Sequence, residues 1–230
     1  MQAPHLNIVQ GQRLWLSPDR CIFWEEEKAL ILSDLHFGKT GHFRKAGIAI
    51  TPQVYKEDLQ RLVNQIQYFQ PKKLIIVGDL FHSRENKELD LFRKWRDDLN
   101  GIEIVLIKGN HDILQHDWYH KTGISLADES LLIGDFLFRH DMSLPGVNTD
   151  VSGVLPYLFS GHIHPGILLR GMGKQSLRFP CFYFTETYCV LPAFSHFTGQ
   201  ALIEPEYGEH VFAIVDKGIL HLKYDLVQRR

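Results

Sequence analysis

Three uninterrupted apolar runs, separated by two helical patterns, dominate the first half of the chain. Residues 29–33, 74–77 and 104–107 read ALILS, LIIV and IVLI, which is typical of strands buried on both faces. Between them, apolar residues recur at helical spacing over 51–69, which opens on a Thr-Pro pair, and over 87–99. This strand–helix–strand–helix–strand order predicts a parallel sheet core.

The second half of the chain has the pattern of antiparallel hairpins. Residues 131–133 and 136–138 flank a Gly-Asp turn, and residues 211–215 and 219–222 flank an Asp-Lys-Gly turn. Further short strands are expected at 13–16, 21–24 and 157–160. We therefore predict an α/β protein with a mixed sheet, or two packed sheets, and outer helices. No linker or repeat divides residues 1–230, which we expect to form a single domain.

Side chains suited to binding metal ions follow five of the predicted strands. They lie in Ser33-Asp34-Leu35-His36, Gly78-Asp79, Gly109-Asn110-His111-Asp112, Arg139-His140-Asp141 and Gly161-His162-Ile163-His164. Ligand sites in α/β sheets lie beyond the carboxyl ends of the strands, so we expect these side chains to converge on one rim. Alternate residues can aim at one point where the chain stays roughly extended.

Seven oxygen and imidazole donors are then available: Asp34, His36, Asp79, Asn110, His140, His162 and His164. A donor set without thiolates suits Mn, Fe or Zn rather than a soft metal. Seven donors are too many for one ion, but they suit two ions if one carboxylate bridges. Two ions roughly 3.5–4 Å apart can clamp both oxygens of an in-line displacement at phosphorus. The sequence therefore predicts a two-metal phosphoesterase.

Each motif also has an ordinary structural interpretation. A lone Asp-x-His seldom binds metal, a Gly-Asp after a strand is usually a turn, and a lone His-x-His is commonly a surface pair. Five such motifs in this order, each at the end of a predicted strand, are difficult to explain in that way.

The same series of motifs resembles the calcineurin-like metallophosphoesterase superfamily over residues 30–165. The resemblance implies a metallophosphoesterase-type β-sandwich of two mixed sheets flanked by helices. It implies one metal ion held by Asp34, His36, Asp79 and His164, and a second held by Asp79, Asn110, His140 and His162. Asp79 would then bridge the two ions.

For the reaction, the resemblance implies that His111 is the catalytic histidine near the leaving-group oxygen. Two cations lower the pKa of the water between them, and the resulting hydroxide attacks phosphorus. A protonated His111 can stabilise or protonate the leaving oxygen. Asp112 could orient His111 or a ligand histidine, or it could cap a helix that starts there.

A second set of motifs is similar to the bacterial DNA ligase-associated metallophosphoesterases. These motifs lie at 33–39, 42–48, 78–83 and 192–199. Members of that group are encoded beside an ATP-dependent DNA ligase and a helicase, and are regarded as Mn-dependent DNA nucleases or phosphodiesterases in repair. The resemblance therefore implies Mn as the metal, DNA as the substrate, and a functional association with ligase and helicase.

Candidate substrate contacts lie beside the metal motifs. Lys39, His42 and Arg44 follow the first motif, where they could contact phosphate groups or remain solvated loop charges. His82, three residues after Asp79, could touch substrate or be an ordinary loop histidine.

Composition adds an expected compartment. The net charge of -2 does not by itself demand a nucleic acid, because binding depends on where basic residues cluster. The three cysteines lack C-x-x-C spacing, the N-terminus lacks a signal-peptide pattern, and no apolar run reaches membrane-spanning length. We therefore expect a cytoplasmic enzyme with no membrane partner, and buried, unpaired cysteines.

Two other functions fit the same residues. The substrate could be a small phosphoester, a cyclic nucleotide or a nucleotide-linked lipid pyrophosphate. A lipid substrate would favour an amphipathic, membrane-facing lid, and the sequence has no such segment. The chain could instead be an interaction scaffold, but the presence of all seven donors and His111 argues against this.

Overall fold

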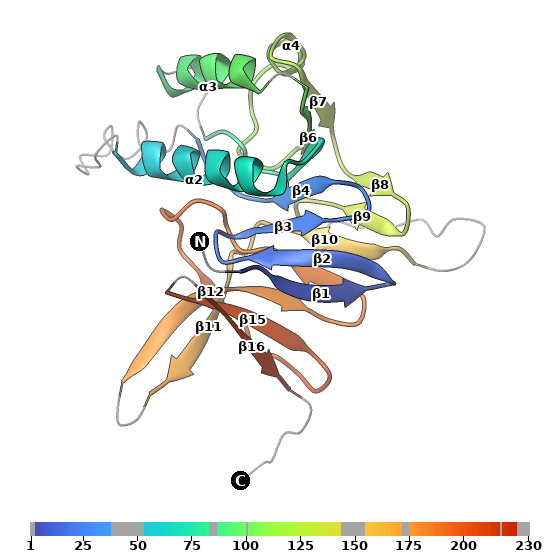
Figure 1. The fold of residues 1–230 in the computed structure, drawn as a ribbon, viewed down its shortest axis with the longest axis vertical. Coiled ribbons are helices and arrows are strands. Elements are labelled where there is room, and N and C mark those ends of the chain that lie inside the picture. Colours follow the sequence, from blue (N-terminus) through green and yellow to red (C-terminus); the bar gives the residue numbers. More distant parts are fainter. Residues whose placement is uncertain are drawn as a thin grey trace.

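Two β-sheets pack against each other in the computed structural model, and helices cover the outer face of the first sheet (Figure 1). The structure describes residues 3–37, 53–82, 87–99, 101–143, 155–171, 175–216 and 218–224. The arrangement is the α/β fold of two mixed sheets that the sequence predicts.

The first sheet has seven strands whose spatial order follows the chain. They are β1 (His5–Val9), β2 (Gln12–Ser17), β3 (Cys21–Trp24), β4 (Ala29–Leu32), β5 (Lys73–Val77), β6 (Glu103–Ile107) and β7 (Ile124–Ala127). Strands β1 to β4 pair antiparallel, and β4 to β7 pair parallel. The carboxyl ends of β4, β5 and β6 therefore lie side by side.

Three helices supply the apolar cover of this sheet: α2 (Gln53–Phe69), α3 (Lys87–Asp98) and α4 (His116–Lys121). Leu62 of α2 and Phe92 of α3 pack with Leu30 and Leu74 in one core on this side. Ile31 and Ile75, one position further along their strands, face the second core between the sheets. Because successive strand residues point to opposite faces, continuous apolar runs can feed both cores.

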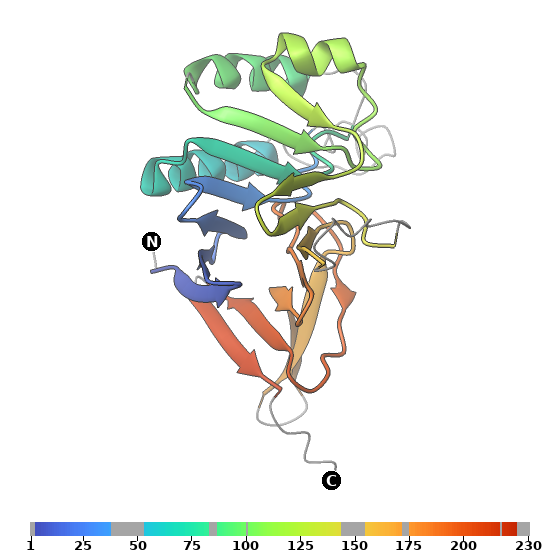
Figure 2. The ribbon, with the colours of Figure 1, turned by 90° about the vertical axis from the view of Figure 1, so that its right-hand side faces the viewer.

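The second sheet contains nine strands and faces the first across that second core (Figure 2). They are β8 (Leu131–Ile133), β9 (Phe136–Phe138), β10 (Tyr157–Ser160), β11 (Pro165–Arg170), β12 (Ser176–Phe184), β13 (Tyr188–Val190), β14 (Ala201–Leu202), β15 (His210–Val215) and β16 (Gly218–Lys223). Strands β9 and β10 are parallel neighbours, so their carboxyl ends also lie together.

The structure confirms the parallel core and both predicted hairpins, β8–β9 and β15–β16. All three cysteines are buried and free, as expected. The interpretation of Asp112 as a helix cap is wrong, because the next helix starts four residues later at His116. Within the described segments, no helix has the length and apolar character needed to cross a bilayer.

Candidate metal centre

The predicted metal-binding side chains meet where the two sheets adjoin. The loops after β4, β5 and β6 carry Asp34, Asp79 and Asn110, and those after β9 and β10 carry His140 and His162. Backbone hydrogen bonds join the loops to one another: Asp34 N–H donates to the Gly78 carbonyl (3.1 Å) and His36 N–H to the Asp79 carbonyl (2.9 Å). Across the sheets, His162 N–H donates to Asp34 Oδ2 (3.1 Å).

Two groups of donor atoms are close enough to share an ion. In each group, all ligand atoms lie within 4.8 Å of one another, and the members are Asp34, His36 and His164, and Asp34, Asp79 and His140. His164 Nε2 is 3.2 Å from Asp34 Oδ1, and His140 Nε2 is 3.5 Å from Asp79 Oδ1. Asp34 is thus common to both groups, while Asp79 faces His140 on one side and His36 Nδ1 (4.0 Å) on the other.

The remaining two predicted donors lie beside the second group. His162 Nδ1 is 3.3 Å from His140 Nε2, so the two rings direct nitrogens at a common point. Asn110 is exposed, between Gly109, which packs on Asp79, and His111, whose N–H donates to Asp79 Oδ1 (2.9 Å). Six of the seven predicted donors therefore lie around one centre, and the chain neighbours of Asn110 contact Asp79 in that centre.

Five of these donors share an unusual backbone conformation. Asp34, His36, Asp79, His162 and His164 have φ angles of 54°, 50°, 51°, 69° and 52°. Residues other than glycine rarely adopt this left-handed region, and each such residue costs on the order of 1–3 kcal/mol. The Asp-x-His and His-x-His pairs therefore do not have the roughly extended backbone that the sequence analysis considered, because each of these residues has left-handed φ.

Two glycines provide the space that these loops need. A Cβ at Gly78, where φ is +80°, would lie 2.1 Å from His140 Nδ1. A Cβ at Gly109 would lie 2.3 Å from Asp79 Oδ1. Gly78 is therefore required for turning and for close approach, and Gly109 for close approach alone.

Backbone carbonyls fix the orientation of two of the imidazoles. His140 Nδ1 lies 3.0 Å from the Val77 carbonyl, and His164 Nδ1 lies 3.2 Å from the Gly199 carbonyl. A neutral imidazole that donates Nδ1–H to a carbonyl has its lone pair on Nε2. In both rings, Nε2 faces a carboxylate of the centre.

The electrostatics of the centre fit divalent cations. Asp34 and Asp79 are buried, with carboxylate oxygens no more than 4.8 Å apart. Burial by itself raises the pKa of Asp34, but His164, His140 and His36 together hold that pKa below its ordinary value. Two buried carboxylates at this distance repel unless a cation lies between them, so the donor set fits positive charge at the centre.

His111 and His82 form the exposed side of the centre. Half of the His111 side chain is exposed (47%), and its Nε2 is 3.9 Å from Asp79 Oδ2. The His82 ring lies 4.2 Å from the His111 ring, centre to centre, and 5.5 Å from that of His36. The structure therefore brings His82 to the site, whereas Lys39, His42 and Arg44 lie outside the described residues.

Asp112 supports the loop that carries His111. Its carboxylate accepts hydrogen bonds from the N–H groups of Gly109 (2.9 Å) and Phe81 (3.1 Å). Among the described residues no imidazole donates to it, so these bonds support loop anchoring in place of the orienting role considered from the sequence. Burial raises the pKa of Asp112 to about 7, even though these two bonds favour the ionised form. The side chain thus joins the loops after β5 and β6.

Sequence reasoning missed the polar residues beneath the centre. Gly199, which orients His164, belongs to the 192–199 segment, singled out only as a motif. Asp58, Arg61 and Gln65 are buried on α2 among its apolar positions. Polar residues at three- and four-residue spacing within an apolar helix face are the signal that could have revealed them.

Comparison with known proteins identifies the family of the chain. The sequence model of the family described as calcineurin-like phosphoesterase matches residues 28–175. The crystal structure of the Pseudomonas putida nuclease MPE is similar, with a TM-score of 0.78 and 30% identity, over 94% of this chain and 100% of that one. Yfce, a phosphoesterase from E. coli, aligns with a TM-score of 0.42 and 13% identity, over 86% and 99%. Comparison with curated protein sequences gave no match.

Proposed function

The chain belongs to the calcineurin-like phosphoesterase family and is a metal-dependent phosphoesterase, and from this we propose that it hydrolyses phosphodiester bonds in DNA. One observation carries the proposal: His111 stands, half exposed, beside two donor groups that share Asp34. The 30% identity to a nuclease over nearly the whole chain supports a nucleic acid as the substrate.

We assign the seven donors to two divalent cations, for which Mn²⁺ is well suited and Fe or Zn is possible. Asp34, His36, Asp79 and His164 would hold one ion, and Asp79, Asn110, His140 and His162 the other. Bound there, the two ions supply a hydroxide at neutral pH and neutralise charge on the phosphoryl oxygens. The Val77 and Gly199 carbonyls orient the rings of His140 and His164 so that Nε2 is directed inward.

We assign His111 the role of protonating the leaving oxygen. Its N–H holds Asp79, so the loop is fixed while the exposed ring remains available to substrate. A protonated imidazole in that place donates its proton to the departing oxygen. His82, packed against the same ring, restricts how far it can turn.

Replacement of His111 tests this assignment. We expect wild-type protein supplied with Mn²⁺ to cleave single-stranded DNA and bis-p-nitrophenyl phosphate, and His111→Ala to lose about 10²–10⁴-fold of kcat on DNA. The loss should be smaller on the ester, because p-nitrophenolate leaves without a proton. Mn²⁺ binding should be unchanged, since His111 is not assigned as a ligand.

His116→Ala is the matched control, because His116 is an exposed histidine that pairs with Asp128 and is not an assigned donor. Cleavage of the ester alone by wild-type protein would redirect the search to small phosphoesters or cyclic nucleotides. A protein that binds Mn²⁺ but hydrolyses neither substrate would favour an interaction scaffold.

A pocket with cationic and aromatic residues beside the His111 loop supports a polymeric substrate. Its volume is about 470 Å³, and its lining includes Arg93, Ile113, Trp118, and Lys121 in an ion pair with Asp117 (2.6 Å). The Arg93 guanidinium lies over the Trp118 ring, 5.4 Å from its centre. Ile113, two residues after His111, is 47% exposed. Cationic and aromatic groups of this kind hold single strands through phosphates and bases.

We expect Arg93→Ala combined with Lys121→Ala to raise KM for long single-stranded DNA about three- to tenfold. The slope of log kcat/KM against log salt concentration should flatten by about 0.7 for each phosphate group that the variant no longer neutralises. Hydrolysis of bis-p-nitrophenyl phosphate should not change, since it is too small to span the pocket and the centre. Lys94→Ala is the control, because Lys94 is an exposed cation on α3, the helix that carries Arg93. An equal rise in KM in that variant would show that the effect comes from general charge attraction and not from the pocket.

The motifs at 33–39, 42–48, 78–83 and 192–199 extend the proposal to biological context. Their similarity to the ligase-associated group supports action in DNA repair, in the cytoplasm, in functional association with a DNA ligase and a helicase. Deleting the gene and scoring survival after strand-breaking damage would test that context.

A further inference from the structure

A cluster of buried and half-buried charges lies beneath one side of the centre. It consists of Arg20, in the turn between β2 and β3, and of Asp58 and Arg61 on helix α2, and we call these three residues the arginine cluster. Arg61 is 8% exposed and Asp58 4%, and their side chains pair at 3.0 Å. Buried charged groups are costly, and an ion pair offsets that cost only where further hydrogen bonds satisfy it.

The further hydrogen bonds of the arginine cluster go to the segment 192–199. Arg20 Nη1 donates to the carbonyls of Ala193 (3.2 Å) and Ser195 (2.8 Å), and Arg61 Nη2 donates to the carbonyl of Phe194. The Arg61 guanidinium also stacks on the Phe194 ring, 4.3 Å from its centre.

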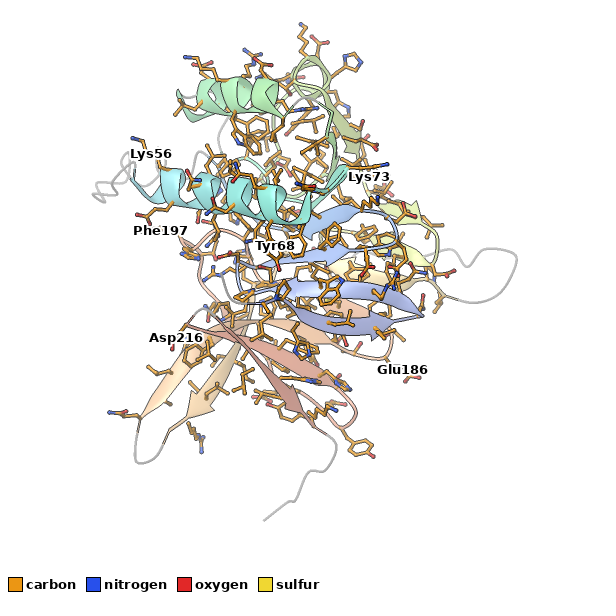
Figure 3. All side chains as sticks on the ribbon, in the orientation of Figure 1. Lys56, Tyr68, Lys73, Glu186, Phe197 and Asp216 are labelled. Carbon is orange, nitrogen blue, oxygen red and sulfur yellow. The ribbon has the colours of Figure 1, made fainter. Side chains whose placement is uncertain are left out.

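Asp58 adds a third anchor from the same helix. Its carboxylate accepts hydrogen bonds from the Ser195 hydroxyl and the His196 backbone N–H. Figure 3 shows Phe197, at the end of this anchored stretch, below the first turns of α2. Three charged side chains therefore fix four consecutive residues of a segment with little regular structure.

The same segment touches the metal centre on its other side. Phe194 N–H donates to the Ser33 carbonyl (2.8 Å), and Ser195 N–H donates to the Asp34 carbonyl (3.1 Å). Gly199 supplies the carbonyl that orients the His164 ring. Asp34 and His164 are two of the donors assigned to one ion. His140 is oriented by Val77 of the first sheet instead.

We propose that the arginine cluster is a positioning device for one of the two metal ions, acting through the segment 192–199 on Asp34 and His164. This proposal rests on the proposed two-ion centre but not on the identity of the substrate. Because the segment reaches two members of the Asp34–His36–His164 group and only the shared Asp34 of the other group, loss of the cluster should weaken the two sites unequally. Indirect partners of metal ligands typically contribute about 10–100-fold to metal affinity.

Mn²⁺ titration tests this inference without any substrate. We expect wild-type protein to bind two ions, and Arg61→Met to raise Kd for one of them at least tenfold while the other changes less than threefold. The readouts are isothermal titration calorimetry and the electron paramagnetic resonance signal of coupled Mn²⁺ pairs. Arg61→Lys keeps the charge beside Asp58 but loses the planar fork, so an intermediate Kd is expected.

Leu62→Ala controls for loss of stability, because it opens a cavity in the same helix (Leu62 is 1% exposed) and removes no hydrogen bond to the segment. Equal weakening of both ions in Arg61→Met, or the same selective loss in Leu62→Ala, would overturn the inference. So would unchanged Mn²⁺ binding in Arg61→Met and Arg61→Lys. If Arg61→Met does not fold, the same Mn²⁺ titration is made on Arg61→Lys and Arg20→Lys, and weaker binding of one ion is again expected.

Failure of the proposed function has a different signature. A wild-type protein that binds two Mn²⁺ ions without cleaving DNA would refute nuclease activity and leave the positioning role intact. If the wild-type protein cleaves DNA and the variants bind Mn²⁺ with unchanged affinity, the nuclease activity is supported and the positioning role is refuted.

Discussion

Asp79→Asn is expected to lower kcat/KM for phosphodiester hydrolysis about a thousandfold while the protein remains folded. Metal ions contribute several kcal/mol to stabilising charge in the transition state, and about 4 kcal/mol corresponds to roughly a thousandfold in rate. Asp79 is 2% exposed, lies between His36 and His140, and is assigned to both ions. Losing its charge therefore weakens both sites together.

The choice of asparagine separates chemistry from folding. Asp79 has φ of 51°, a conformation that asparagine tolerates better than most other residues. An amide oxygen can still accept the hydrogen bond from His111 N–H. We therefore expect an unchanged melting temperature without metal, and a much smaller rise in melting temperature on adding Mn²⁺.

Asp135→Asn, at the exposed β8–β9 turn, is the control and should behave as wild type. A fully active Asp79→Asn protein would contradict the two-ion assignment. An active site that needed Asp34 but not Asp79 would point instead to Asp34 as the shared ligand, since Asp34 belongs to both close donor groups.

Gly78→Ala is expected to be the most damaging small substitution. Its Cβ would lie 2.1 Å from His140 Nδ1 and 2.3 Å from Cγ of the same ring. The His140 ring cannot move away freely, because its Nδ1 is hydrogen-bonded to the Val77 carbonyl and the ring packs against His162. Displacing a reacting group by about 1 Å can cost about a hundredfold in rate, and overpacking costs about 1–3 kcal/mol of stability.

Gly11→Ala isolates the steric part of that effect. Gly11 has φ of +77°, close to the +80° of Gly78, but nothing lies within 4 Å of the position of its Cβ. Both variants therefore bear the backbone cost of a left-handed alanine, about 1 kcal/mol, and only Gly78→Ala meets His140. We expect Gly11→Ala to keep full activity. Thermal unfolding and Mn²⁺-dependent hydrolysis, measured on both, would show equal losses if close approach to His140 were unimportant.

The sequence alone determined the main strands of this protein and predicted its candidate donors. Continuous apolar runs such as 74–77 and 104–107 can be little other than buried strands, and the structure has them as β5 and β6. The donors follow from the same local order, because a parallel sheet brings the ends of its strands together whatever the loops do. For that reason the convergence of the candidate donors was predictable before any contact was known, whereas the role of His111 was predicted only from the family resemblance.

Only the tertiary structure decided how the donors are held. The left-handed backbone at Asp34 and His36 contradicts the extended geometry that the spacing suggested, because bonds to the neighbouring loop over-determine it. The arginine cluster joins residues separated by as many as 175 positions along the chain, from Arg20 to Ser195. Such contacts depend on how two sheets and a helix pack, and local pattern contains no information about that packing.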